Sequence, residues 1–288
     1  MENVQAYLVN AFTADGIGGN PAGVVLHADS LSNQQKLAIA KEVGFSETAF
    51  VCQDNEVDFA VSFFTVTDEV DFCGHATLAA FSTMYAQGLI SEGQYIQRTK
   101  AGLLGVYVDA TGHVVMEQRL PEFKGVFDSE LIAPLIGLEA ERLASTNLPI
   151  EVVSTGLSDL IVAVPHGSLD SLVVDESRLV AFCKEHNVVG LHAFELCNQQ
   201  LSVTAHCRNF APLFGISEES ATGSSTGALA SYLTKHFDGI ETQFLFEQGR
   251  AMGCISRLSA SIKLQGQTIT QVKVGGFAKQ FDTQTIHV

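Results

Sequence analysis

The sequence predicts an α/β fold of two related halves, each with strands around one central helix. Three observations support this prediction. The chain has 288 residues, which suggests two domains at ~150 residues per domain. Hydrophobic residues make up 46% and charged residues 17%, enough apolar material for sizeable cores and a composition that argues against disorder. Two almost uncharged helical segments of similar sequence begin at residues 73 and 224, an offset of 151.

The first third of the chain predicts strands around two helices. Ser32–Val43 is expected to be a helix, because Ser32 and Gln35 match a capping box and Gly44 supplies a C-cap. The segment from Cys73 to Gly88 is a second helix, and its almost uncharged sequence indicates burial on most sides. Strand patterns occupy Val4–Phe12, Val24–Leu26, Glu47–Val51, Val57–Val66, Tyr95–Thr99, Leu103–Val108 and Val114–Gln118.

The segment Leu120–Asn147 carries two prolines, two glycines and two short helical stretches, and it is the candidate inter-domain connection. We therefore expect an N-terminal domain over 1–120 and a C-terminal domain over 121–288, whose last strand could return to the first domain. In the second domain, helices are expected near Leu169–Glu185 and over 224–237. Strands are expected at Val152–Ser154, Leu160–Val164, Val188–Leu196, Leu201–Phe210, Thr242–Glu247, Ile255–Leu264, Val272–Val274 and Thr285–Val288.

The two uncharged helices align without gaps. Leu78 matches Leu229, Ala79 matches Ala230, and Cys73 falls opposite Ser224. Chance similarity between alanine-rich helices is one explanation, and internal duplication is the favoured one. Free N–H groups and the helix dipole favour an anion at each helix start, so two N-termini facing one cleft would suit a substrate carboxylate.

Composition excludes several functions. Acidic residues outnumber basic ones by 32 to 16, which disfavours nucleic-acid and anionic-membrane binding. Apolar runs fall short of the ~18 residues of a membrane helix, and no secretory signal is visible, so a cytoplasmic location is expected. The six cysteines form no C-x-x-C pair, so we expect reduced thiols and no metal site.

Several motifs in order along the chain resemble the PhzF-like (phenazine-biosynthesis) family, within the diaminopimelate-epimerase-like fold. They begin with Phe12-Thr13 and continue through Gly19–Leu26, Ile39–Val43 and Ser46–Val51. The later ones are Cys73–Ala79, Val153–Leu157, Glu219–Ser224, Glu247–Gly249 and Val274–Gly276. Each motif is weak alone, but their order and spacing together make the resemblance specific.

The resemblance implies two pseudo-repeat, barrel-like β domains, each wrapped around a central helix. It also implies a cofactor-free isomerase of a biosynthetic process, often a homodimer, which acts on a small carboxylate-bearing substrate such as a cyclic hydroxy or amino acid. Glu47 is then the acid/base that relocates a proton. The implied substrate contacts are Gly74, His75, Glu219, Gly223, Ser224 and Ser225, and Asn20, Cys73 and Gly276 are further candidates.

The residues themselves suggest how this chemistry would work. Burial beside the apolar segment Thr48–Val51 would raise the pKa of Glu47 toward neutrality. The positive end of the helix would keep His75 neutral. Glu219 either orients substrate or pairs with His75, or it is a helix-approach residue favourable to the dipole. Two-thiol racemisation is disfavoured, because the residue opposite Cys73 is Ser224, and a hydroxyl is a much weaker base than a thiolate. We therefore interpret Cys73 as a small buried residue.

Two alternatives stay open. Glu219-Ser220 replaces the Asp-Pro usual in the family, and Gly253–Ser256 replaces Gly-Arg-Pro-Ser, so a non-catalytic small-acid-binding protein is one alternative. An amino-acid epimerase or racemase is the other. Hydrolase and nucleotide-binding functions are disfavoured, because the sequence has no Gly-x-Ser-x-Gly elbow, P-loop or Rossmann fingerprint.

Overall fold

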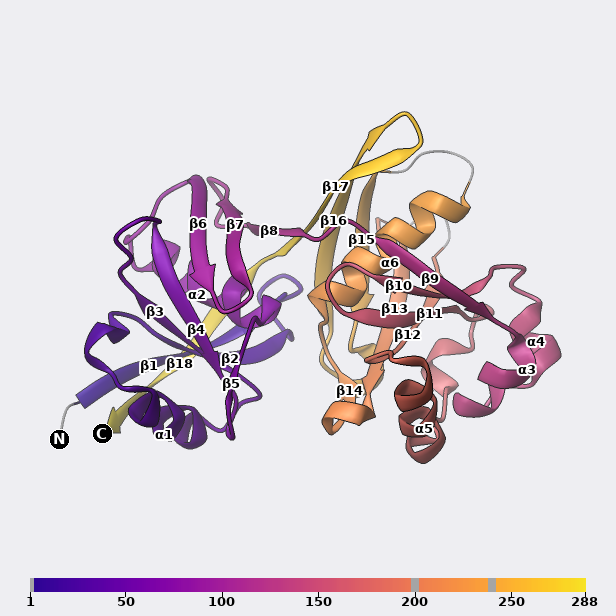
Figure 1. The fold of residues 1–288 in the computed structure, drawn as a ribbon, viewed down its shortest axis with the longest axis horizontal. Coiled ribbons are helices and arrows are strands. Elements are labelled where there is room, and N and C mark those ends of the chain that lie inside the picture. The colour runs from indigo at the N-terminus through magenta and orange to yellow at the C-terminus, as the bar shows by residue number, and fades with distance from the viewer. Residues whose placement is uncertain (1–2, 198–201, 238–241) are drawn as a thin grey trace. The chain divides into compact units, whose positions relative to one another are not determined.

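The computed structural model describes residues 3–197, 202–237 and 242–288 and divides into two compact units (Figure 1). Unit 1 comprises Met1–Glu117 and Gly275–Val288, and unit 2 comprises Gln118–Val274. The sequence suggested a boundary at residue 120 and a last strand that could return to the first domain. The chain leaves unit 1 after Glu117 and re-enters it after Val274.

Unit 1 is a mixed sheet with helices on both of its faces. The pairing runs β18–β1–β2–β3–β4–β6–β7–β8, with β5 added to β4. The β2–β3 and β4–β6 pairs are parallel, and the others are antiparallel. The strands are β1 (Asn3–Ala11), β2 (Asn20–Val25), β3 (Thr48–Cys52), β4 (Phe59–Phe64), β5 (Glu69–Val70), β6 (Gly93–Thr99), β7 (Gly102–Val108), β8 (Val114–Gln118) and β18 (Ala278–His287).

Helix α1 (Asn33–Val43) connects the parallel strands β2 and β3 and covers one face of the sheet. The predicted capping box is confirmed: Ser32 is the N-cap and Gln35 reaches back to its backbone, while Gly44 ends the helix with a φ of 75°. Its buried residues Ile39, Ala40 and Val43 pack with β-strand side chains, including Ile286 of β18. Burying this apolar face stabilises the helix more than its intrinsic propensity does.

Helix α2 (Gly74–Ala86) is the central helix of unit 1 and contacts β1, β2, β3, β7 and β18. Leu78, Ala79 and Phe81 have no exposed surface, as the uncharged sequence predicted. In the buried interior, Thr77 and Thr83 donate their hydroxyls to the carbonyl oxygens one turn back, Cys73 and Ala79, so their polar atoms are satisfied within the helix.

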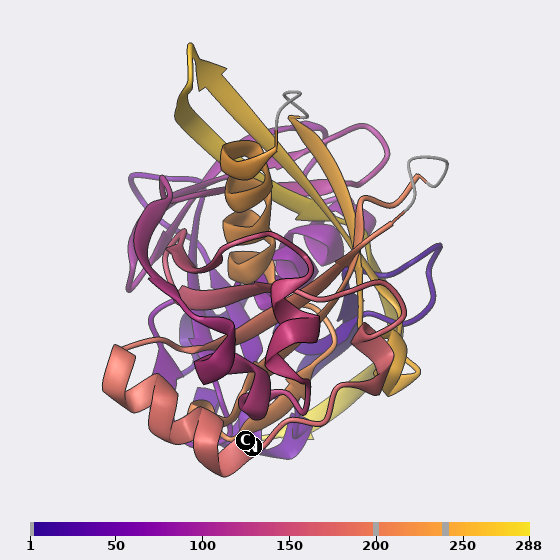
Figure 2. The same ribbon diagram turned by 90° about the vertical axis from the view of Figure 1, so that its right-hand side faces the viewer.

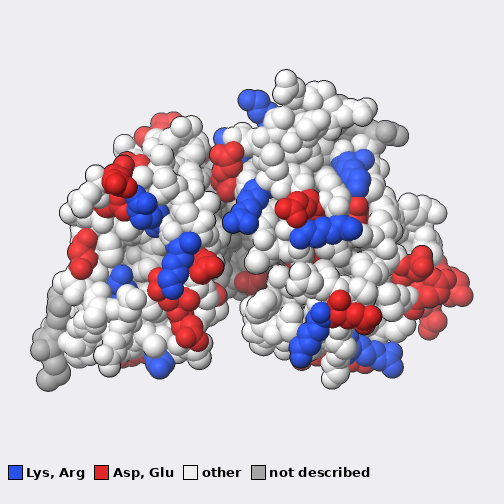
Figure 3. All heavy atoms as spheres, in the orientation of Figure 1, with Lys and Arg blue, Asp and Glu red and all other residues white. Residues whose placement is uncertain are grey.

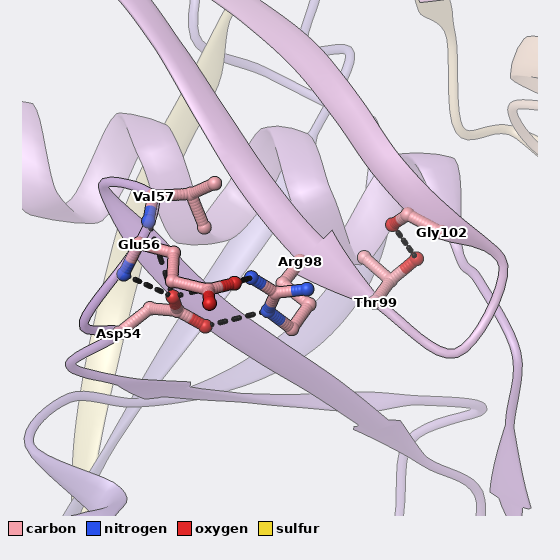
Figure 4. Close-up of polar contacts among 6 residues, drawn as sticks. All are labelled: Asp54, Glu56, Val57, Arg98, Thr99 and Gly102. Carbon is pink, nitrogen blue, oxygen red and sulfur yellow. Dashed lines mark hydrogen bonds and ion pairs between the residues drawn. The ribbon is translucent and has the colours of Figure 1, made fainter.

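An ion-pair cluster fixes the turn between β3 and β4 against β6 (Figure 4). Arg98 donates to Asp54 at 2.8 Å and to Glu56 at 2.7 Å. Asp54 also accepts the backbone N–H groups of Glu56 and Val57. The Arg98 hydrogen bond and these backbone donors lower the pKa of the partly buried Asp54 to about 2.

Unit 2 repeats the design of unit 1. Its strands are β9 (Glu122–Phe127), β10 (Ile150–Ser154), β11 (Ser158–Ala163), β12 (Gly190–Leu196), β13 (Ala205–Ala211), β14 (Ile216–Glu219), β15 (Gln243–Gln248), β16 (Ser256–Gln265) and β17 (Thr268–Gly276, which ends in unit 1). Its helices are α3 (Ser129–Ile132), α4 (Ala140–Ala144), α5 (Glu176–His186) and the central α6 (Gly223–His236), which runs alongside the strands in Figure 2.

Six strand pairings recur in the same order in both units, which supports the predicted duplication. In unit 1 they are β1–β2, β2–β3, β3–β4, β4–β5, β4–β6 and β6–β7. In unit 2 they are β10–β11, β11–β12, β12–β13, β13–β14, β13–β15 and β15–β16. The second and fifth pair of each series are parallel. Helices α1 and α5 occupy equivalent connections, as do α2 and α6.

Two predictions about unit 2 are confirmed only in part. The segment Leu120–Asn147 contains the two expected short helices, α3 and α4, but it also forms β9, which pairs with β10, so it belongs to unit 2 and does not connect the two units. Ile132 and Leu143 from this segment lie in the core of unit 2. The helix expected over Leu169–Glu185 begins only at Glu176, after the N-cap Asp175, because Leu169–Ser171 forms a separate 3-10 turn. Leu201, expected to begin a strand, lies outside the described residues.

Charged side chains are interspersed on the face shown in Figure 3, where basic and acidic groups alternate in small clusters. Among the described residues, none of the helices has the length and hydrophobicity needed to span a membrane.

Gly190→Ala should destabilise the protein by about 1–3 kcal/mol, the range for overpacking. A Cβ at Gly190 would collide with the carbonyl oxygen of Phe210. The matched control is Gly105→Ala in β7, where a Cβ would have nothing within 4 Å, and it should change stability little. Urea denaturation monitored by circular dichroism would measure both, and equal effects would contradict the close approach at Gly190.

Candidate active site

Glu47 lies in the short connection between α1 and β3, where its backbone is fixed on both sides. The left-handed Gly44 ends α1, and β3 begins at Thr48 in parallel register with Gly23 of β2. The Glu47 carbonyl oxygen accepts the Gly23 N–H at 3.1 Å. A Cβ at Gly23 would lie 2.7 Å from the Thr48 hydroxyl, so the close approach of β2 and β3 at this point depends on glycine.

The Glu47 carboxylate faces His75 in the first turn of α2. Nε2 of His75 lies 3.2 Å from Oε2 of Glu47, and the side chains are 6% and 19% exposed, respectively. The separation suits an ion pair. Nevertheless, Oε2 is buried and accepts no hydrogen bond of good geometry from any residue that the structure describes. One carboxylate oxygen is therefore shielded from water and still has accepting capacity.

Cys73 and Ser46 complete this cluster. Cys73 is the N-cap of α2, and its Sγ lies 3.3 Å from Nδ1 and 3.9 Å from Nε2 of His75. The Ser46 hydroxyl lies 3.5 Å from Nε2. The imidazole thus has the thiol at one nitrogen and the carboxylate at the other.

The Glu47 pKa differs from the sequence prediction. Burial alone raises it, as expected, but interactions with His75, Ser46 and Cys73 together outweigh burial and bring the pKa of Glu47 below its usual value. The prediction of a raised pKa is therefore wrong, because the neighbours of the carboxylate could not be known from the sequence. At neutral pH, Glu47 is a carboxylate, the form that accepts a proton.

The prediction that His75 is neutral is also wrong. Burial lowers its pKa, but contacts with Cys73 and Glu47 outweigh burial and bring the pKa of His75 well above its usual value. We assign the main effect at neutral pH to Glu47, because burial raises the pKa of Cys73 and keeps the thiol protonated. The opposing helix dipole is weaker than this adjacent charge.

In unit 2, the predicted residue Glu219 holds the start of α6. Oε2 of Glu219 accepts the hydroxyl of the N-cap Thr222 at 2.6 Å. Gln248 donates to the Glu219 carbonyl at 2.6 Å and to the Thr222 hydroxyl at 3.1 Å. These bonds agree with the helix-approach interpretation of Glu219.

Ser225, another predicted contact, belongs to a fully buried polar network. Its hydroxyl donates to Asp159 at 2.7 Å and accepts from Asn209 at 3.0 Å. Asn209 also lies 3.2 Å from Nδ1 of His192. Burial raises the pKa of Asp159 to about 6, despite the Ser225 hydrogen bond, and lowers the pKa of His192 to about 3.

A sequence profile for the family described as "Phenazine biosynthesis-like protein" matches residues 9–283. The chain belongs to this family. A relative from Clostridium acetobutylicum, named an uncharacterized isomerase, is 32% identical over 94% of both chains. The trans-2,3-dihydro-3-hydroxyanthranilate isomerase of Pseudomonas chlororaphis is 29% identical, over 97% of this chain and 98% of the relative. A PhzF-family crystal structure from Bacillus anthracis matches with a TM-score of 0.90 at 29% identity, over the full length of both chains.

These relatives identify the PhzF-family chain as an isomerase, and the shared fold confirms the predicted architecture.

The other residues predicted to contact substrate lie at the starts of α2 and α6 or in strands of unit 1. Gly74 is the first residue of α2, Asn20 is buried at the start of β2, and Gly276 is buried at the end of β17. Gly223 begins α6, and the Ser224 carbonyl accepts the Thr155 hydroxyl. Their roles as substrate contacts stay predictions.

The repeated topology of the PhzF-family chain identifies positions in unit 2 equivalent to the cluster in unit 1. Glu47 immediately precedes β3, and Val189 immediately precedes the equivalent strand β12. The N-cap of α2 is Cys73, and the N-cap of α6 is Thr222. The ungapped sequence alignment paired Cys73 with Ser224, which lies two residues after Thr222, its equivalent in the structure. Neither a second carboxylate nor a second thiol occupies these equivalent positions.

Sequence reasoning missed three contributors. Ser46 and Gly23 stand beside Glu47 in the structure, and only the family motifs around them gave any signal. Asp159 is a lone acidic residue in an apolar strand, and the continuous apolar run that follows it could have indicated its burial. The ligand atoms of Glu47, Cys73 and His75 all lie within 4.8 Å of one another, so these three residues could hold a metal ion.

Glu47→Gln should lower the pKa of His75, because only burial and the thiol contact would remain. In the wild type, the raised pKa of His75 provides stability that is full below the unfolded-state value of about 6.5 and is lost as pH rises through the folded-state value. Histidine NMR titration would measure the change. His113, whose pKa burial lowers, is the control. An unchanged His75 titration in the variant would refute the ion pair.

Asp159→Asn should flatten the pH dependence of stability. Native Asp159 has a pKa of about 6, above its usual 3.8, so the folded state binds more protons between these values and loses stability as pH rises through them. Melting temperatures at about pH 4 to 7 would measure this slope. Asp128→Asn, at an exposed helix N-cap of unit 2, is the control. A slope equal to wild type would show that Asp159 is ionised throughout.

Proposed function

We propose that this isomerase shifts a proton within a small carboxylate-bearing substrate, without a cofactor, and that Glu47 is the general acid/base. The observation that carries the proposal is the shielded Oε2 of Glu47, which lies beside His75 and accepts no hydrogen bond from the described residues. This oxygen lies beside the imidazolium, and it still has a lone pair with which to accept a proton from carbon.

The proposed reaction begins with Glu47 as carboxylate, the form that its lowered pKa favours. Glu47 removes a proton from a carbon activated by a neighbouring enamine, carbonyl or carboxylate group. The C–H electron pair passes into the conjugated system of the substrate. The Glu47 carboxyl group, whose proton can exchange with solvent, then delivers a proton to another carbon, so that a double bond moves. One proton leaves the substrate and one is added, so atoms and electrons balance.

His75 stabilises this reaction electrostatically. As an imidazolium 3.2 Å from Glu47, it compensates the carboxylate before the proton transfer and the negative charge on the substrate after it. Its place in the first turn of α2 also brings N–H groups that lack intrahelical partners near the reacting atoms. Both contributions strengthen in a site that excludes water.

The substrate class comes from the relatives. The Pseudomonas chlororaphis relative is named for trans-2,3-dihydro-3-hydroxyanthranilate, a cyclic compound with a carboxylate, an amino group and a hydroxyl group. We assign the same chemical class to this chain: cyclic hydroxy or amino acids. The presence of Val189 and Thr222 at the positions equivalent to Glu47 and Cys73 supports a mechanism with one base over an epimerase with two.

Solvent deuterium wash-in tests the proposal. The wild-type protein in D₂O should incorporate deuterium into trans-2,3-dihydro-3-hydroxyanthranilate or a related cyclic acid, as measured by NMR and mass spectrometry. Glu47→Gln should lose at least ~100-fold of this rate, the lower bound for loss of a general acid/base. Glu42→Gln, an exposed carboxylate near the end of α1, is the control and should exchange as wild type does.

The other outcomes separate the alternatives. Binding of these acids without any exchange would overturn the proposal and favour a non-catalytic binding protein. Exchange that survives in Glu47→Gln would show that another group is the base. Exchange lost in Cys73→Ala, together with inversion at the exchanging carbon, would favour an epimerase.

A further inference from the structure

We infer that Glu219 and Gln248 are positioning residues that turn the N-cap Thr222 away from α6, so that the first turn of this helix stays open to a small carboxylate. The motifs that contain them, Glu219–Ser224 and Glu247–Gly249, have no part in the proposed proton transfer. The opening of the turn and the binding of an anion there do not depend on the proposed function. Only the use of the turn by substrate rests on it.

Helices α1 and α5 are capped by a side chain at their first turn, whereas α6 is not. Ser32 caps α1 by accepting the Gln35 N–H, and Asp175 caps α5 by accepting the Arg178 N–H. Thr222 is also a preferred capping residue. Its backbone is extended, with a ψ of 101° that is close to the 92° of Asp175. The residue type and the backbone both suit a cap, yet Thr222 makes no side-chain cap hydrogen bond.

The neighbours of Thr222 explain why its hydroxyl does not cap α6. The hydroxyl donates to Oε2 of Glu219 at 2.6 Å and accepts from Nε2 of Gln248 at 3.1 Å. Gln248 is only 1% exposed. It also donates to the Glu219 carbonyl at 2.6 Å and accepts the Thr222 N–H at 3.3 Å. These hydrogen bonds tie Thr222 to the ends of β14 and β15 instead of to its own helix.

The consequence is a first turn whose N–H groups are available to a ligand. The Thr226 N–H is the first that bonds within α6, and it donates to the Thr222 carbonyl at 3.1 Å. The three N–H groups before it, those of Gly223, Ser224 and Ser225, precede any intrahelical acceptor. With no side-chain cap in their way, these donors and the helix dipole together favour an anion.

A buried hydroxyl lies beside this turn and points to the same ligand. Ser256 is directly opposite Gln248 in the β15–β16 pair, and residues opposite each other have side chains on the same face of a sheet. Gln248 reaches the N-cap of α6, and β16 packs against α6. The Ser256 hydroxyl has no exposed surface and no hydrogen-bond partner among the described residues. A carboxylate at the turn would accept this donor after a rotamer change.

The charges at the turn favour a small monocarboxylate. The Glu219 carboxylate already places one negative charge at the N-cap. It repels a dianion more strongly than a singly charged ligand. A single carboxylate is also the group that the proposed substrate class has in common.

Glu219→Ala tests the positioning role without any ligand. Once released from Glu219, the Thr222 hydroxyl can rotate and cap α6, as Ser32 caps α1. Amide hydrogen exchange of Ser224 and Ser225, followed by NMR in the full-length protein, should therefore slow in Glu219→Ala. It should keep the wild-type rate in Glu219→Gln, which retains the acceptor, and in the double variant Glu219→Ala with Thr222→Val, which has no hydroxyl. Equal exchange in Glu219→Ala and Glu219→Gln would overturn the positioning role.

Benzoate titration tests the ligand. In wild-type protein, benzoate should cause saturable shifts in the amide NMR signals of Gly223 and Ser224, and chloride at the same ionic strength should not. Glu219→Ala should bind benzoate about 2- to 30-fold more weakly than the charge-matched Glu219→Gln, the factor that one N-cap hydrogen bond is usually worth. The double variant should regain the affinity of Glu219→Gln. Shifts that chloride reproduces, or a double variant that stays weak, would overturn the site.

Ser256→Ala separates ligand contact from packing. Removing a buried hydroxyl that has no partner should leave stability unchanged or raise it, yet benzoate binding should weaken. Thr234→Val is the matched control, because the Thr234 hydroxyl donates to the Ala230 carbonyl near the other end of α6. It should bind benzoate as wild type does. Urea denaturation measures the stability of each variant. Unchanged binding in Ser256→Ala, or equal loss in Thr234→Val, would overturn the Ser256 contact.

The deuterium-exchange reaction tests whether substrate uses the turn. Compared with Glu219→Gln, Glu219→Ala should raise KM by the factor by which it weakens benzoate, with kcat unchanged, because the turn holds the substrate equally before and during proton transfer. An unchanged KM would overturn this use of the turn. Benzoate binding and amide exchange as expected, in a protein without any deuterium exchange, would remove the proposed function and leave the open turn standing.

Discussion

A carboxylate and an imidazolium lie 3.2 Å apart at the start of a buried helix, and the electrostatics of the Glu47 and His75 cluster depend on that pair. Each group alone would lose its charge on burial, since burial raises the pKa of Glu47 and lowers that of His75. Together they keep opposite charges, because each stabilises the ionised form of the other. The pair therefore supplies both an electron-rich oxygen and a compensating cation in a site with little exposed surface.

The two units show how a duplicated fold can divide its tasks. The strands of the two units pair in the same order, and the central helix of each unit begins with a glycine. Unit 1 places its charged pair at the connection before β3, whereas unit 2 has Val189 there. The ionisable groups of unit 2 instead hold α6 in place: Glu219 accepts the hydroxyl of the N-cap Thr222, and Asp159 accepts the hydroxyl of Ser225. The same scaffold thus holds a charged pair in unit 1 and a helix-supporting polar network in unit 2.

The sequence predicted the fold well because its strongest signals are local or span the whole chain. Ser32, Gln35 and Gly44 specify α1 through contacts within a few residues, and ordered motifs identify the family. It failed where the outcome depends on partners distant in sequence. The directions of the Glu47 and His75 pKa shifts require knowing that residues 28 apart meet. Leu120–Asn147 was misassigned because its prolines and glycines suggested a linker, while its buried isoleucine and leucine side chains were overlooked.

Strand β18 pairs along β1, with His287 opposite Asn3, so the two ends of the described chain lie side by side in Figures 1 and 2. This strand contacts both helices of unit 1, and its Ile286 lies in the core beneath α1. Unit 2 is thus an insertion within unit 1. On the ribosome, unit 2 can close as a continuous segment, while the half that carries Glu47 can complete its sheet only after Gly275–Val288 has followed unit 2. A chain cut after unit 2 would therefore lack the strand that contacts both helices of unit 1.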